Sequence, residues 1–146
     1  MLITENFTLE EFTRSSTAKS MGIDNNPDGT QTEHIIEVAR IIQQFRDFYG
    51  KPVRITSGFR CPVLNRMVGG SPTSAHMTGY AVDFAPLSPS HKAVFQTEFL
   101  RFLMIKNPRF DQVIFEKPDE KGYASWIHIG LYSPKGEQRR QILIGR

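Results

Sequence analysis

Three residues of this chain could together bind a metal ion: His76, Asp83 and His128. Imidazole nitrogens and carboxylate oxygens are common zinc ligands, and three protein ligands leave a fourth tetrahedral position for water, as catalytic sites require. Each residue also has an ordinary structural interpretation, as a loop hydrogen bonder, a strand-end cap and a core histidine, respectively. Spacing alone therefore leaves both a metal site and three separate structural roles open.

Strand alternation predicts that the side chains of Asp83 and His128 both point away from the core. In the segment 126–131, WIHIGL, alternate side chains put two isoleucines and a leucine on one face and His128 on the other. The same rule applied to the segment 81–84, AVDF, turns Asp83 away from the core, beside a small alanine. The carboxylate then lies in a tight place, where an unpaired charge is costly and a metal ion or another cation is the usual partner.

The third residue, His76, can reach the same place through a turn. It lies seven positions before Asp83, and Gly79 between them allows the chain to fold the imidazole back. A structural zinc site would use several thiolates, whereas the only cysteine is Cys61, which we interpret as a packing residue. One cysteine also excludes an intramolecular disulfide and fits a reducing cytoplasm.

Two capping signals predict helices before these residues. Thr8 and Glu11 form a capping box at the start of a short helix. Thr30 and Glu33 repeat the signal at the start of a long amphipathic helix that Gly50 ends. A further helix is expected from Ser90 onward, with a buried face that includes Phe95, Phe99, Phe102 and Leu103.

Alternating and β-branched runs predict five strands: Val53 to Thr56, Tyr80 to Phe84, Gln112 to Glu116, Trp126 to Leu131 and Gln141 to Ile144. We expect the last strand to pair back antiparallel after the turn at Ser133 to Gly136. The segment Cys61 to Thr78 is rich in Gly, Pro and Ser and should be mostly loop, with one helical turn. The predicted fold class is α+β, with helices packed on a mainly antiparallel sheet.

Composition predicts a single globular domain over residues 1–146, because 146 residues with 39% hydrophobic content can bury one core. No stretch approaches the ~20 apolar residues of a membrane-spanning helix. We therefore expect no membrane insertion. The net charge of +3 comes from scattered basic residues, so we expect no nucleic-acid partner either. The N-terminal residues have no basic start and no continuous apolar segment, so we expect no signal peptide and synthesis in the cytoplasm.

A ten-residue motif connects two of the candidate ligands. The segment Ser74 to Asp83, SAHMTGYAVD, matches S-x-H-x-x-G-x-A-x-D and so resembles the M15 zinc peptidases, the D-alanyl-D-alanine carboxypeptidase-like family. Upstream, the segment 55–60, ITSGFR, with Asn65 and the glycine pair 69–70, looks like the arginine-bearing turn of that family. Downstream, Trp126-Ile127-His128 looks like its last-ligand strand.

The resemblance extends from about Phe7 to Leu131 and is closest to a compact phage and prophage branch of that family. It implies the α+β fold of hedgehog and D-Ala-D-Ala peptidases. It also implies that His76, Asp83 and His128 bind one Zn2+ per chain. Zinc would lower the pKa of a bound water to roughly 7 and polarise the scissile carbonyl.

The resemblance further implies three residues that contact the substrate: Arg60, Ser74 and Asn65. Arg60 matches the arginine of the family, and its planar guanidinium would stabilise the developing oxyanion or hold a substrate carboxylate. A surface salt bridge is the structural alternative for this arginine.

The general base is where the sequence departs from better-known M15 peptidases. Those usually carry an acidic residue three positions before the last histidine ligand, and here that position is Ser125. Glu116 is the best replacement, because it ends the neighbouring predicted strand, although a solvated strand-end residue is an equal alternative. Asp119 and Glu120 are weaker candidates on the following loop.

These features predict a zinc metallopeptidase that cleaves a D-amino-acid-containing bond in peptidoglycan peptide, either as a D-Ala-D-Ala carboxypeptidase or as a murein endopeptidase. An endolysin-like enzyme without a signal peptide would reach the cell wall through a holin-like pore or on a phage particle. The alternative is a non-catalytic, zinc-containing cell-wall-binding or phage-structural module, which the serine at position 125 favours. The bond cleaved and the oligomeric state are left open.

Overall fold

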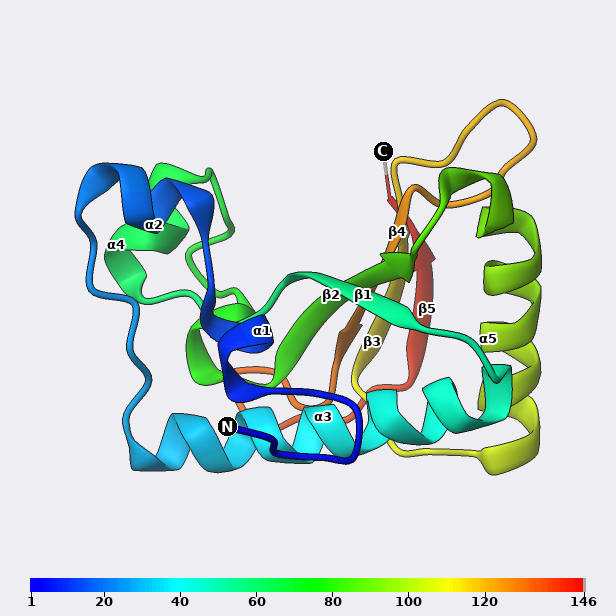
Figure 1. The fold of residues 1–146 in the computed structure, drawn as a ribbon, viewed down its shortest axis with the longest axis horizontal. Helices are drawn as coiled ribbons and strands as arrows, with labels where there is room; N and C mark the ends of the chain where they lie inside the picture. The colour runs from blue at the N-terminus through cyan, green and yellow to red at the C-terminus, as the bar shows by residue number, and fades with distance from the viewer. Residues whose placement is uncertain (146) are drawn as a thin grey trace.

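The computed structural model describes residues 1–145, and Figure 1 shows how they are arranged. The helices are α1 (Leu9–Thr13), α2 (Ser16–Met21), α3 (Gly29–Tyr49), α4 (Pro62–Met67) and α5 (Lys92–Lys106), with 3-10 turns η1 (Ala75–Thr78) and η2 (Pro89–His91). The strands are β1 (Val53–Ser57), β2 (Ala81–Pro86), β3 (Gln112–Glu116), β4 (Trp126–Gly130) and β5 (Gln141–Ile144). The fold is α+β, as predicted. Among the described residues, no helix combines the length and the apolar character needed to cross a membrane.

Side-chain caps determine where α1 and α3 begin. The predicted capping box of α1 is present, since Thr8 Oγ1 accepts from the Glu11 amide at 3.3 Å and the Glu11 carboxylate accepts from the Thr8 amide at 3.0 Å. In α3 the box is formed by Asp28 and Gln31 instead, at 2.7 and 2.8 Å. The prediction that Thr30 caps this helix is wrong, because Asp28 is at least as good an acceptor and caps the first turn earlier.

The strands form one sheet in the order β1-β2-β4-β3-β5. The pairs β1–β2, β2–β4 and β3–β4 are antiparallel, whereas β5 runs parallel to β3. The prediction that residues 141–144 pair back antiparallel is therefore wrong. The chain does turn back after β4, but β2 and β3 occupy both edges of β4. The returning strand therefore pairs with the free edge of β3, which already runs opposite to β4.

The region between Cys61 and Thr78 is more helical than predicted. It contains the helix α4 and the turn η1. Pro62 lies in the first turn of α4, where a backbone N–H would have no partner within the helix, so proline is tolerated there. Helix α2 is also absent from the sequence prediction, although Ser15 caps it by accepting from the Ala18 amide at 3.2 Å. Helices of about six residues are too short to produce a clear apolar period.

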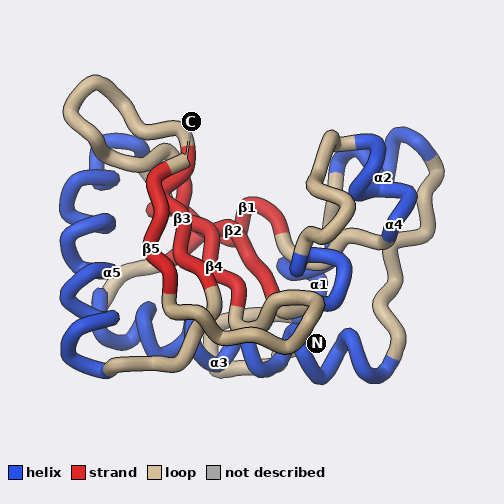
Figure 2. The backbone as a smooth tube through the Cα atoms, turned by 180° about the vertical axis from the view of Figure 1, so that it is seen from behind, coloured by secondary structure: helices blue, strands red, loops and turns tan. Residues whose placement is uncertain are grey.

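The core lies between the sheet and the two long helices. Phe45 of α3 meets Phe95 and Phe99 of α5 edge to face, with ring centroids 5.3 and 5.0 Å apart, and packs on Phe84 of β2 at 6.1 Å. Figure 2 shows α3 running beneath the strands and α5 standing beside them. These helices bury one face of the sheet and leave the other face available for a site.

Candidate metal centre and active site

Asp83 and His128 are neighbours across two paired strands. Asp83 on β2 lies opposite His128 on β4 in the antiparallel register. The flanking residues on both strands are buried in the core: Val82, Phe84, Ile127 and Ile129. Strand alternation therefore turns Asp83 and His128 to the opposite face, as the sequence predicts.

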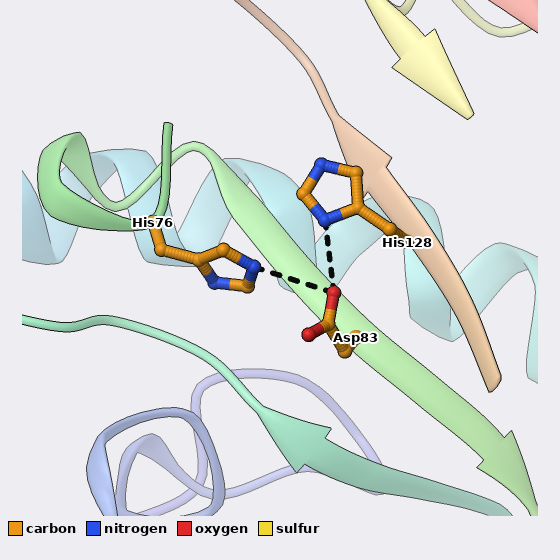
Figure 3. Close-up of side chains that lie close together, drawn as sticks. All are labelled: His76, Asp83 and His128. Atoms are coloured by element: carbon orange, nitrogen blue, oxygen red, sulfur yellow. Dashed lines mark hydrogen bonds and ion pairs between the residues drawn. The ribbon is translucent and has the colours of Figure 1, made fainter. Parts of the chain in front are cut away.

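The turn η1 carries His76 to the same place. Ser74 caps this turn, with its Oγ accepting from the His76 amide at 3.1 Å, and Gly79 ends it with φ of 89°. A side chain at position 79 would lie 2.6 Å from the carbonyl oxygen of Gln31, so the turn requires glycine on steric as well as conformational grounds. Figure 3 shows the imidazole of His76 directed at the carboxylate of Asp83.

The three side chains converge on one carboxylate oxygen. His128 Nδ1 lies 2.9 Å from Asp83 Oδ1, and His76 Nε2 lies 3.3 Å from the same atom. One potential ligand atom from each residue lies within 4.8 Å of the other two. Two imidazole nitrogens and one carboxylate oxygen make a three-ligand set that suits zinc and leaves a coordination position for a water or a substrate.

The tautomer of His76 explains why this group needs a cation. His76 Nδ1 lies 2.7 Å from the carbonyl oxygen of Gly58, which can only accept, so Nδ1 carries the proton. In the neutral imidazole, Nε2 is then an acceptor that faces another acceptor, Asp83 Oδ1. Burial lowers the pKa of His76 by more than the charge of Asp83 raises it. The lowered pKa favours this neutral form. A bound metal ion would replace the repulsion between two lone pairs with two coordinate bonds.

Asp83 stays ionised in this setting. Burial raises the pKa of Asp83. When His76 is protonated, its charge and the hydrogen bonds from His128 and from protonated His76 outweigh burial and hold the pKa of Asp83 well below its usual range. Its side chain is only 14% exposed. When His76 is in the neutral form that burial favours, the buried negative charge needs another cation.

Arg60 lies beside the candidate ligands with part of its guanidinium unpaired. Its backbone amide donates to His76 O at 3.1 Å, and its Nη2 lies 3.4 Å from Ser74 Oγ. The Nε atom is buried and has no hydrogen-bond partner. Burial lowers the pKa of Arg60, only partly offset by Asp83, and the group remains a cation. The alternative role, a surface salt bridge, is absent among the described residues, so the guanidinium is available to an anionic ligand.

A cleft of about 780 Å³ opens over these residues. Its floor is the face of β2, β4 and β3 that the helices leave uncovered. One wall consists of Arg60 and residues of the segment 68–76, and the other consists of residues of the segment 133–139 after β4. An open cleft over a sheet floor can accept a peptide.

Glu116 lies in this cleft, on the same floor as His128. It ends β3 opposite Trp126 of β4, and both residues line the opening. His128 is the next residue of β4 on that face, so Glu116 and His128 are diagonal neighbours, which typically lie about 7–8 Å apart across a strand pair. The Glu116 carboxylate packs against Gly145, where an added side chain would meet Oε2 at 2.6 Å.

The other acidic candidates and Ser125 lie outside the cleft. Ser125 is exposed, and its Oγ donates to Lys117 O at 2.6 Å. Asp119 forms an ion pair with Lys92 at 3.0 Å, and Glu120 is exposed on the same loop. None of these side chains lines the opening, so Glu116 is the one of the predicted acidic candidates that borders the cleft.

Asn65 is a buried residue of α4. Its side chain is buried and donates through Nδ2 to Ser71 O at 2.8 Å, while its backbone carbonyl oxygen accepts from the Gly70 amide at 2.8 Å. It does not line the cleft, whereas Ser74 does. In this structure the Asn65 amide supports the wall at residues 68–74, and its contact with a substrate stays a prediction.

Sequence reasoning missed the C-terminal wall of the cleft. Asp111 and Arg139 line it, together with residues 133–137. Alternation along β3 puts Gln112 on the same face as Glu116. From this signal the sequence could have predicted that β3 contributes to the floor of the cleft. No local pattern connects Arg139 with Asp111, because the two residues are 28 positions apart.

A comparison with known protein families assigns the chain to one of them. The family described as Peptidase M15 matches residues 5–129, which is most of the 146-residue chain and includes His76, Asp83 and His128. No match was found among curated proteins. The chain therefore belongs to the peptidase M15 family.

Proposed function

We propose that this protein is a zinc-dependent peptidase that hydrolyses a D-amino-acid-containing bond in peptidoglycan peptide. The observation that carries the proposal is the set of mutually facing donor atoms of His76, Asp83 and His128 at the floor of an open cleft. Family membership supports the peptidase class. The mixture of nitrogen and oxygen donors supports zinc as the metal.

The three candidate ligands would hold the metal with their orientation already set. The Gly58 carbonyl fixes the tautomer of His76, and hydrogen-bonded partners of this kind typically change metal affinity or activity by about 10–100-fold. Zinc, when bound, supplies a Lewis acid for the scissile carbonyl and an acidified water. The sheet supplies the rigid support, because Asp83 and His128 lie on paired central strands.

Arg60 and Ser74 would bind the substrate on one side of this centre. The guanidinium of Arg60, which lines the cleft, has no carboxylate partner among residues 1–145 and contacts Ser74 Oγ, suits a carboxylate or a developing oxyanion. A free C-terminal carboxylate, as in a D-Ala-D-Ala end, is one such group.

Glu116 would act as the general base. A carboxylate on the cleft floor, one step along the strand from His128, can accept the proton of the attacking water and return it to the leaving amine. Movement of its side chain away from Gly145 and toward His128 would be needed, and side-chain rotation of this kind is fast. Such proton transfers contribute about 10²–10⁴-fold to the rate.

The test is release of new amino groups from purified peptidoglycan. Turnover is expected to need zinc and to disappear with a chelator. It should fall by about 10²–10⁴-fold in Glu116→Gln, with zinc content unchanged. Glu120→Gln is the matched control, because this exposed glutamate lies outside the cleft and its loss should leave turnover unchanged.

A non-catalytic wall-binding module is the second candidate, and Ser125 is the observation that favours it. This residue stands where many M15 peptidases have an acid, and its hydroxyl is bound to Lys117 O. Undiminished wall binding by zinc-loaded protein without any amine release would support the module and contradict the enzyme.

A further inference from the structure

The C-terminal part of the chain completes the cleft, although it lies beyond the family match. That match ends at residue 129, whereas Ser133, Lys135 and Arg139 line the same opening as the candidate metal centre. In Figure 2 the loop that joins β4 to β5 crosses the lower ends of the strands. This segment can therefore contact a substrate whose scissile bond lies at His76, Asp83 and His128.

Arg139 is held in the cleft by a buried carboxylate. Its Nε donates to Asp111 Oδ1 and its Nη2 to Asp111 Oδ2, both at 2.8 Å, and its backbone amide donates to Oδ1 at 2.9 Å. The side chain of Asp111 is 5% exposed, whereas that of Arg139 is 39% exposed. One edge of the guanidinium is thus anchored in the protein, and the rest reaches solvent within the cleft.

The free edge of Arg139 has the geometry to bind a second carboxylate. A guanidinium has five N–H donors, and the bidentate pair with Asp111 uses one on Nε and one on Nη2. Within residues 1–145, Nη1 donates to no protein group. The edge formed by Nη1 and Nη2 can therefore donate two parallel hydrogen bonds, which is the preferred geometry for a carboxylate.

Arg60 and Arg139 come from opposite edges of the sheet. Arg60 follows β1 and Arg139 precedes β5, which are the two edge strands, while Asp83 and His128 lie on strands between them. Five adjacent strands span about 19 Å at the usual spacing of about 4.8 Å. An extended peptide covers this distance with five or six residues at about 3.4 Å each.

We propose that Arg139 binds a carboxylate of the substrate on the β3 and β5 side of the scissile bond, and that Asp111 is the positioning residue for this arginine. The inference rests on the proposed function in taking the His76, Asp83 and His128 centre as the place of reaction. The preferred substrate is then an acidic peptide with carboxylates on both sides of the scissile bond, one near Arg60 and one near Arg139.

A pair of stem peptides tests this recognition by binding. The acidic form is L-Ala-γ-D-Glu-L-Lys-D-Ala-D-Ala, and the matched form carries D-isoglutamine, which replaces the internal carboxylate with an amide. Affinities are measured by calorimetry on the Glu116→Gln protein, so that no peptide is consumed. We expect the acidic form to bind about tenfold to hundredfold more tightly, as charge-assisted hydrogen bonds allow.

Arg139→Gln should remove this preference and leave the affinity for the D-isoglutamine form within about twofold. Arg139→Lys keeps the charge and should retain part of the preference, because an ammonium lacks the bidentate edge. Arg140→Gln is the matched control for net charge, since Arg140 stacks on Phe110 outside the cleft, and it should retain the full preference.

Three outcomes would overturn the assignment: no preference in the parent protein, no binding of either peptide, or an equal loss of affinity for both peptides in Arg139→Gln. The last would mean that the arginine only anchors the C-terminal segment. Thermal unfolding of each variant separates this from misfolding, and Arg139→Lys supplies a second reading if Arg139→Gln does not fold. A preference for the acidic form in a protein that never cleaves peptide would uphold Arg139 and contradict the peptidase proposal.

Discussion

Asp83 and Asp111 are two buried carboxylates in one cleft, and they are neutralised in different ways. Their side chains are 14% and 5% exposed, and each has a pKa below its ordinary value. Asp111 pairs with an arginine, which is charged at every pH of interest. Asp83 faces two histidines, and burial lowers the pKa of one of them, His76, which favours its neutral form.

The difference separates an internally satisfied carboxylate from one that needs an external partner. The guanidinium of Arg139 meets Asp111 with both charge and directed hydrogen bonds, so this pair is complete within the chain. The histidines around Asp83 supply lone pairs as well as N–H groups, and lone pairs suit a metal ion. A contact in which a neutral histidine turns its unprotonated nitrogen toward a buried Asp is therefore a stronger indication of a metal site than an ion pair between Asp and Arg.

The largest expected effect comes from exchanging each carboxylate for its amide. Asp83→Asn should lose bound zinc. Its turnover should fall about a thousandfold, because the metal ion contributes several kcal/mol to catalysis. Asp111→Asn should keep one zinc per chain, because its side chain does not belong to the ligand group. Metal analysis of the dialysed proteins and an amine-release assay measure both effects. Wild-type zinc affinity in Asp83→Asn would break the comparison.

The order of the two variants should reverse when stability is measured without metal. In chelator at about pH 8, Asp111→Asn should lower the free energy of unfolding by about 1–3 kcal/mol, since Arg139 loses its partner. Asp83→Asn should cost nothing or stabilise the fold, because an amide N–H can donate to His76 Nε2 where the carboxylate opposes it. Urea denaturation of both variants and of wild type makes the measurement. Equal destabilisation by the two changes would contradict the lone-pair argument.

The dependence of stability on pH should identify the Asp111 pair. Hydrogen bonds from Arg139, only partly offset by burial, hold the pKa of Asp111 below its ordinary 3.8. A lowered pKa in the fold means that the contribution is complete above about pH 4 and is lost as the pH falls through the folded value. The stability difference between wild type and Asp111→Asn should thus be constant from about pH 5 to pH 7 and shrink below about pH 4. A difference that grew toward acid pH would give the opposite sign and exclude the pair as its source.

Much of the candidate site could be predicted because its geometry depends on short-range rules. A period of two along β2 and β4 is enough to turn Asp83 and His128 to one face, and a single glycine permits the turn that returns His76. The β3 position of Glu116 follows from the same rule. These inferences need only neighbours along the chain or across one strand pair.

The features that sequence reasoning missed depend on distant partners. The parallel pairing of β5 follows from which strand edges remain free, and no residue within 141–144 encodes this. The position of Arg139 depends on Asp111, which lies at the start of another strand. Burial of Asn65 follows from the path of the loop above it, and the loop composition alone does not specify that path.

The smallest expected effect is the influence of salt on the stability contributions of the two carboxylates. Arg139 is partly open to solvent, so raising sodium chloride from about 0.05 to 1 M screens its attraction for Asp111, since the Debye length falls to about 3 Å. The melting-temperature difference between wild type and Asp111→Asn should therefore narrow slightly with salt. The corresponding difference for Asp83→Asn in chelator should stay constant, because His76 is 3% exposed and the contact is shielded from ions. Calorimetric scans at the two salt concentrations decide this, and a salt effect confined to the Asp83 variant would mean that its surroundings are open to solvent instead.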